Sequence, residues 1–107
     1  MSVLVVDDDR DIRLLVRVLL DDRRFGPIWE AADGATALAL ARRHQPDVVV
    51  LDFRMPYADG ETIVGGLRSV APNARAVVLT GTDRPPPDWA HGGIQQVALH
   101  RLGDDLS

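Results

Sequence analysis

The sequence predicts a single α/β domain built on a doubly wound, five-stranded parallel sheet. Segments with helical spacing of apolar residues separate short apolar runs, so strands and helices alternate along the chain. Short connections and right-handed crossovers then favour a parallel sheet with helices on both faces. Three runs lead into oxygen-bearing side chains at what would be one edge of the sheet: residues 3–6 into Asp7, 48–51 into Asp52 and 76–79 into Thr80. Open α/β proteins bind their ligands at that edge.

The first half of the chain is expected to follow a βαβαβ order. Asp9 caps a helix that ends near Asp22, because apolar residues recur at helical spacing between them. A second helix covers residues 35–44, where alanine and leucine dominate, and Pro46 ends it. The third strand is a continuous apolar run of the kind that is buried on both faces of a parallel sheet. The strands of this half are residues 3–6, 28–31 and 47–51.

The segment after the third strand is expected to begin as a loop. Residues 54–60 contain Pro56 and Gly60, both of which interrupt regular structure. A helix then covers residues 61–71, although two glycines inside it each weaken it by up to about 1 kcal/mol relative to alanine.

The last quarter of the chain is the least regular part. A fourth strand covers residues 75–80 and a fifth covers residues 94–99, but the three prolines at 85–87 exclude a helix between them. Residues 102–107 have room for only one helical turn. Part of the sheet near the fifth strand would then be uncovered, so a partner or a second copy of the chain, in a homodimer through the surface of residues 82–107, is expected to cover it. The alternative is that the 107 residues are a fragment whose continuation supplies a helix or an output domain.

Composition limits the class of protein. A chain of 107 residues with 46% hydrophobic and 26% charged residues fits one globular domain, residues 1–107. The absence of cysteine excludes disulfides and fits a cytoplasmic protein. No apolar run is long enough to cross a bilayer. A net charge of -4 gives no reason to expect direct binding to nucleic acid.

Three motifs carry a family resemblance: Val-Val-Asp-Asp-Asp at residues 5–9, Leu-Asp-Phe-Arg-Met-Pro-Tyr-Ala-Asp-Gly at residues 51–60 and Val-Leu-Thr-Gly at residues 78–81. Together they resemble the receiver domain of two-component response regulators, which has a flavodoxin-like, CheY-like fold. The resemblance is good over residues 1–81, whereas residues 82–107 are divergent or truncated.

The resemblance implies a phosphorelay site. Asp52 would accept a phosphoryl group from a sensor histidine kinase or a phosphotransfer protein. Asp8 and Asp52 would bind Mg²⁺ directly, Asp7 mainly through water, and the backbone carbonyl of Arg54 would complete the protein ligands. Oxygen ligands with several retained waters are what Mg²⁺ prefers. Thr80 would hydrogen-bond a phosphoryl oxygen and so signal to a downstream protein target or output domain.

The chain departs from the family pattern where receivers carry a lysine. All 12 basic residues are arginines, so that ammonium is missing. His100 or Arg101 stands at the equivalent place, and in a strand only one of two neighbours can face the site, while the alternative is that both face solvent. Arg54 is a second candidate for the compensating cation. The aromatic residue that receivers often use as a reporter of conformation is here Val97.

These features favour an atypical receiver without enzymatic activity beyond self-phosphorylation and autodephosphorylation. The nearest alternative is a pseudo-receiver that acts by binding proteins without phosphorylation. A phosphohydrolase like the haloacid dehalogenases is remote, because its motif Asp-x-Asp-x-Thr/Val would end here at Asp11 and its lysine is absent.

Overall fold

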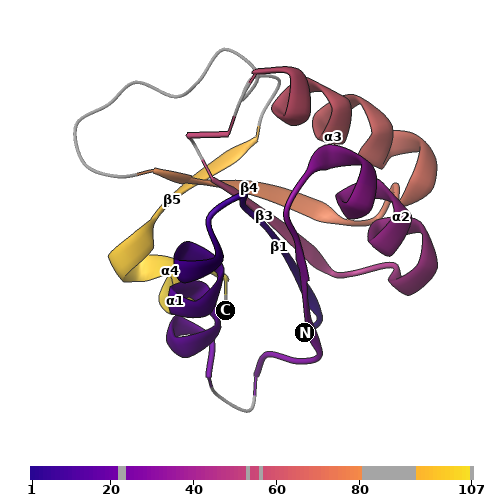
Figure 1. Cartoon of the computed structure of the whole chain (residues 1–107). Coiled ribbons are helices and arrows are strands. Elements are labelled where there is room, and N and C mark those ends of the chain that lie inside the picture. The colour runs from indigo at the N-terminus through magenta and orange to yellow at the C-terminus, as the bar shows by residue number, and fades with distance from the viewer. Residues whose placement is uncertain (22–23, 53, 56, 81–93, 107) are drawn as a thin grey trace.

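The computed structural model describes residues 1–21, 24–52, 54–55, 57–80 and 94–106. Its five strands form one parallel sheet in the order β2-β1-β3-β4-β5 (Figure 1). The strands are β1 (Val3–Val6), β2 (Ile28–Ala31), β3 (Val48–Asp52), β4 (Arg75–Thr80) and β5 (Gln95–Ala98). The predicted doubly wound parallel sheet is therefore confirmed.

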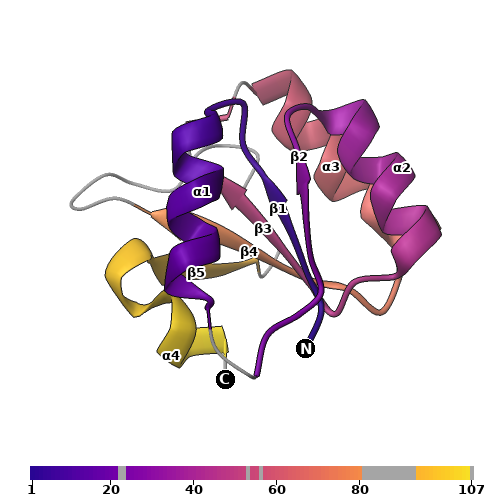
Figure 2. The ribbon, with the colours of Figure 1, turned by 60° about the horizontal axis from the view of Figure 1, so that its bottom comes forward.

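The helices cover both faces of this sheet (Figures 1 and 2). α1 (Arg10–Leu19) and α4 (Leu102–Leu106) lie on one face, and α2 (Gly34–His44) and α3 (Tyr57–Val70) lie on the other. A short 3₁₀ turn, η1 (Leu99–Arg101), connects β5 to α4. No helix in the described part of the chain is both long and apolar enough to span a membrane.

Alternating side chains of the central strands fill two cores. Leu4 and Val6 of β1 belong to the core under α2 and α3, whereas Val3 and Val5 belong to the core under α1 and α4. All four are at most 1% exposed, which is why the central strands read as unbroken apolar runs.

Asp9 and Asp33 fix the starts of the first two helices. The Asp9 carboxylate accepts a hydrogen bond from the backbone N–H of Asp11 (2.8 Å), as the sequence predicts for a cap. Asp33 accepts from the backbone N–H of Thr36 (2.8 Å), and this hydrogen bond lowers the pKa of the Asp33 carboxyl. α1 ends at Leu19, earlier than the predicted end near Asp22.

The expected loop at residues 54–60 is wrong over its second half, because α3 already begins at Tyr57. Contact with α2 explains why a helix continues through Gly60. A Cβ placed on Gly34 would lie 3.5 Å from the backbone oxygen of Asp59 and 3.5 Å from Cβ of Thr62. Packing of the first turn of α3 against α2 therefore outweighs the low helix propensity of the segment.

The end of the chain closes onto the sheet. Leu102 and Leu106 of α4 are 1% and 0% exposed and belong to the same core as Val97 of β5. The predicted single helical turn is thus slightly longer and packs against the sheet face near β5. The three prolines at 85–87, and residues 82–93 of the expected dimer surface, lie outside the described residues.

Candidate functional site

The carboxyl ends of β1 and β3 bring two acidic residues together inside the protein. Val6 pairs with Leu51 in the parallel register, so Asp7 and Asp52 follow at neighbouring positions. Both carboxylates are buried, with residue exposures of 1% and 5%. Buried carboxylates without a paired cation are rare, because the charged form loses its hydration. This pair therefore marks a site and not a simple strand end.

Hydrogen bonds fix both the backbone and the side chain of Asp7. Its backbone N–H donates to the carbonyl of Ala31 (3.0 Å), and its Oδ1 accepts from the backbone N–H of Asp9 (2.8 Å). Its Oδ2 is buried and receives no hydrogen bond from any residue that the structure describes. Burial, together with the neighbouring carboxyl of Asp52, raises the pKa of Asp7 to about 7. A cation placed against Oδ2 would offset this unfavourable burial.

Arg54 is the cation that the structure places on Asp52. Its backbone N–H donates to Oδ1 of Asp52 (3.1 Å), and its Nε donates to Oδ2 (3.3 Å). The Arg54 side chain is 50% exposed, while that of Asp52 is 6% exposed. The guanidinium therefore reaches from solvent to a buried carboxylate.

Asp8, Asp9, Asp52 and Arg54 line an open pocket of about 320 Å³ at this edge of the sheet. The oxygen-rich lining and the bare Oδ2 of Asp7 fit a hard divalent cation. Over the described ranges, no three His, Cys, Asp or Glu side chains are grouped so that they alone could hold a metal ion. Mg²⁺ is commonly bound through one or two carboxylates and retained waters, so the chemistry of the pocket suits it without such a group.

The structure gives less information on the other expected site residues. Thr80 ends β4 opposite Ala98 of β5, but its side chain lies outside the described part, as does that of His100. Nε of Arg101 lies 3.5 Å from Oδ1 of Asp105, and Arg101 does not line the pocket. His100 and Arg101 belong to the 3₁₀ turn η1 and not to a strand, so the strand alternation on which their prediction rested does not apply to them.

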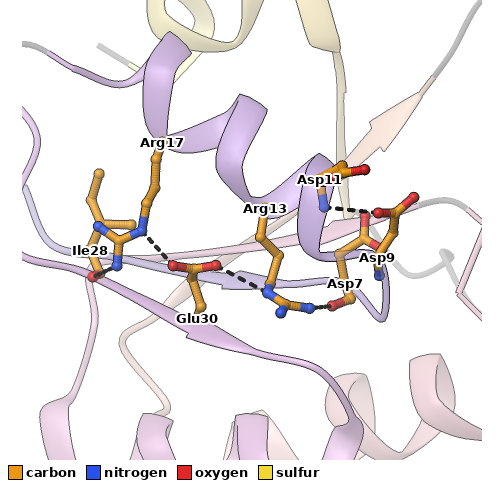
Figure 3. A network of polar contacts seen from close by, with 7 residues as sticks. All are labelled: Asp7, Asp9, Asp11, Arg13, Arg17, Ile28 and Glu30. Carbon is orange, nitrogen blue, oxygen red and sulfur yellow. Dashed lines mark hydrogen bonds and ion pairs between the residues drawn. The ribbon is translucent and has the colours of Figure 1, made fainter.

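A network of hydrogen bonds and ion pairs between α1, β2 and the backbone of Asp7 was not predicted from the sequence (Figure 3). Arg13 and Arg17 project from α1 toward Glu30 on β2, with Nε···Oε distances of 3.0 and 2.6 Å. Arg13 also donates from Nη1 to the backbone carbonyl of Asp7. The spacing of the two arginines by one helical turn was the available signal, but nothing local links them to a residue on the next strand.

Comparison with known proteins agrees with this fold and pocket. Residues 3–92 match the family described as the response regulator receiver domain. The chain therefore belongs to the receiver domains of response regulators, the signalling modules of two-component systems.

The individual relatives point the same way. A protein of Pseudomonas aeruginosa is 41% identical over 98 residues, covering 92% of this chain and 46% of that protein. The probable transcriptional regulatory protein TcrX of Mycobacterium tuberculosis is 40% identical over 83 residues, covering 78% of this chain and 35% of TcrX. The chain thus spans less than half the length of these relatives.

Among solved structures, the chemotaxis protein CheY4 of Vibrio cholerae is 29% identical with a TM-score of 0.79. The match covers 98% of this chain and 94% of that one. The fold of this chain is therefore similar to that of this solved structure.

Proposed function

We propose that this receiver accepts a phosphoryl group on Asp52 and does so with Mg²⁺ bound in the adjoining pocket. The observation that carries the proposal is the buried Asp52 carboxylate, which opens into a pocket beside the uncompensated Oδ2 of Asp7. Phosphoryl transfer depends mainly on positioning and on neutralising charge. A pocket with a nucleophilic carboxylate, further oxygen ligands and an arginine supplies these elements.

Each residue of the pocket has a distinct role in this proposal. Asp52 is the nucleophile. Asp8 and the carbonyl of Arg54 join Asp52 in holding the metal, and Asp7 acts through bound water. Mg²⁺ would neutralise the negative charge that gathers on the carboxylate and the incoming phosphoryl oxygens. The hydroxyl of Thr80 would hydrogen-bond one of those oxygens.

Arg54 takes over part of the task that lysine performs in other receivers. Its guanidinium already contacts Oδ2 of Asp52 and is half exposed, so it has room to shift toward a phosphoryl oxygen. A guanidinium is permanently charged and binds phosphate oxygens well, although its flat fork differs from a compact ammonium.

The partners follow from the phosphorelay. A sensor histidine kinase or a phosphotransfer protein would supply the phosphoryl group. The output would be contact with a protein target or an attached output domain, which is supported by relatives such as TcrX that are named as transcriptional regulators and are more than twice as long as the matched segment.

The test is intact-protein mass spectrometry after incubation with acetyl phosphate and Mg²⁺. A phosphate-sized mass increase is expected in the wild type and not in Asp52→Asn, with both proteins shown to be folded by circular dichroism. No increase in folded wild type would contradict the proposal. That result would favour the pseudo-receiver, in which the Arg54 contact simply neutralises Asp52 and signalling proceeds through binding alone.

A further inference from the structure

The backbone carbonyl of Asp7 accepts a hydrogen bond from Nη1 of Arg13, whose side chain reaches it from α1 (Figure 3). Asp7 is the first residue after β1, and no backbone N–H among the described residues donates to this carbonyl. Arg13 is only 15% exposed at its side chain, and its Nε simultaneously donates to Oε1 of Glu30 (3.0 Å). One planar guanidinium therefore bridges the end of β1 and the edge strand β2.

Glu30 is itself fixed. Its second carboxylate oxygen accepts from Nε of Arg17 (2.6 Å), and Arg17 also donates to the carbonyl of Ile28 (2.7 Å). In the sheet, Glu30 lies beside Val5 in register with β1. The anchor for Arg13 is thus a strand residue held by a second arginine, and not a mobile surface carboxylate.

The same residue, Asp7, carries the buried carboxylate that neighbours Asp52, and Asp52 lines the pocket. Its N–H is held by Ala31, its Oδ1 by the N–H of Asp9, and its carbonyl by Arg13, which leaves Oδ2 as the atom without a hydrogen bond. Rotation of the Asp7 peptide would move both carboxylate oxygens. Among the described residues drawn in Figure 3, Arg13 is the only one whose side chain donates a hydrogen bond to the backbone carbonyl of Asp7.

We propose that Arg13 is a positioning residue that holds the acidic loop after β1, residues 7–9, in the geometry needed for the cation, with Glu30 as its anchor. This inference rests on the proposed metal-binding function. Arg13 acts through Asp7 and does not contact the metal. Partners that orient metal ligands in this way typically change metal affinity by 10- to 100-fold when they are removed.

The direction in which Mg²⁺ affinity changes distinguishes a positioning role of Arg13 from an effect of its charge alone. Removing a nearby positive charge should strengthen the binding of a cation if electrostatics alone mattered. Removing a positioning contact should weaken it. Arg13→Met removes both the charge and the contacts, whereas Arg13→Lys keeps the charge but lacks the fork that reaches two acceptors at once.

Arg17→Met is the matched control. Arg17 lies one turn further along α1, pairs with the same Glu30 and contacts β2, but it has no hydrogen bond to Asp7. Its loss should loosen the link between α1 and β2 without releasing the acidic loop. Any general effect of weakening this salt-bridge network should therefore appear in Arg17→Met as well.

The experiment is an amide NMR titration with Mg²⁺ on the full chain, combined with hydrogen exchange of the Asp9 amide in the absence of metal. We expect Mg²⁺ affinity to fall about tenfold in both Arg13→Met and Arg13→Lys and to stay unchanged in Arg17→Met. We also expect faster exchange of the Asp9 amide, which donates to Asp7, in the two Arg13 variants alone.

Two results would overturn the positioning role: Mg²⁺ binding that is equal or tighter in Arg13→Met, or exchange of the Asp9 amide that matches Arg17→Met. If the wild type shows no Mg²⁺-dependent shifts, the proposed metal function fails. The exchange data would still decide whether Arg13 restrains the loop, because they are recorded without metal. The remaining amide signals report whether each variant is folded.

Discussion

At the scale of single residues, Arg54 is the cation that the structure places against the buried Asp52. It contacts both oxygens of Asp52, once through its backbone and once through its side chain. A cation that stabilises a charged transition state contributes strongly in a partly dehydrated pocket. The missing lysine therefore need not leave the phosphoryl group without a positively charged partner.

We expect Arg54→Gln to slow labelling of Asp52 by acetyl phosphate at least about tenfold, because the neutral amide cannot stabilise the added charge. The initial rate of mass increase measures this. Arg101→Gln is the control, since Arg101 pairs with Asp105 and does not line the pocket, and it should label at the wild-type rate. Faster labelling of Arg54→Gln would instead mean that Arg54 blocks access to Asp52.

Glu30 gives a prediction for pH. The hydrogen bond from Arg17 holds the pKa of the Glu30 carboxyl below its ordinary 4.5, and the bond from Arg13 adds to this, although partial burial opposes both. A carboxyl with a lowered pKa stabilises the fold above the unfolded value, and this contribution disappears as the pH falls through the folded value. Glu30→Gln should therefore be less stable than wild type at pH 7, and the difference should shrink below pH 4.5.

Urea denaturation of wild type and Glu30→Gln, at pH 7 and again below pH 4.5, measures this difference in stability. Asp33 and Asp47, whose pKa values are also lowered, titrate equally in wild type and variant, so the comparison isolates Glu30. A stability difference that stays constant across this pH range would show that the Glu30 charge contributes nothing and that the loss comes from contacts that Gln does not replace.

At the scale of elements, two neighbouring glycines of α3 are in different surroundings. A Cβ on Gly65 would meet nothing within 4 Å. A Cβ on Gly66 would lie 2.6 Å from Cδ1 and 2.8 Å from Cδ2 of Leu38 on α2. Gly66 therefore allows the two helices to approach closely, whereas Gly65 has no such role.

Gly65→Ala should stabilise the protein by about 0.5–1 kcal/mol, because alanine forms helices better than glycine. Gly66→Ala should gain clearly less or become destabilising, since Leu38 must move to admit the methyl group. Thermal unfolding of both variants beside the wild type measures the two effects. Equal stabilisation by both substitutions would show that Leu38 shifts at no energetic penalty.

How far the sequence predicts the structure can be judged from particular elements. The central strands β1 and β3 follow from apolar runs that are buried on both faces, and the Asp9 cap follows from local hydrogen bonding. The early start of α3 does not follow, because it depends on packing against α2. Local propensity carries no information on such contacts.

The candidate site also has parts that the sequence predicts and parts that it does not. Asp7 and Asp52 come from strand ends, and the parallel register alone brings them together. The Arg13–Glu30 contact joins residues on different elements, and the place of Arg101 depends on a 3₁₀ turn instead of a strand. Both depend on tertiary geometry, which a strand or helix pattern does not contain.

At the scale of the whole molecule, the acidic pocket depends on both layers of the fold. Its residues follow β1 and β3, which lie between one core under α1 and α4 and another under α2 and α3. Domains of this size have net stabilities of only about 5–15 kcal/mol. A short element that contributes to one core therefore matters for the geometry of the pocket.

The short α4 is the clearest case, because its two leucines are fully buried although it lies near the end of the described chain. Leu106 is 0% exposed and packs in the core that includes Val97 of β5. Leu106→Ala should lower the free energy of unfolding by about 2–4 kcal/mol, as expected for a cavity in a close-packed core. Equilibrium denaturation in urea measures this loss.

Leu14→Ala on the outer face of α1 is the matched control, since Leu14 is 59% exposed and should change stability by no more than about 0.5 kcal/mol. If Leu106→Ala were equally mild, α4 would be a loosely attached tail, and β5 would lose the cover that we assign to it. A large loss with an unchanged dependence on urea would mean instead that α4 unfolds together with the sheet. The described part of the divergent segment, residues 94–106, would then be an integral part of the receiver fold, because the buried leucines of α4 pack in the same core as Val97 of β5.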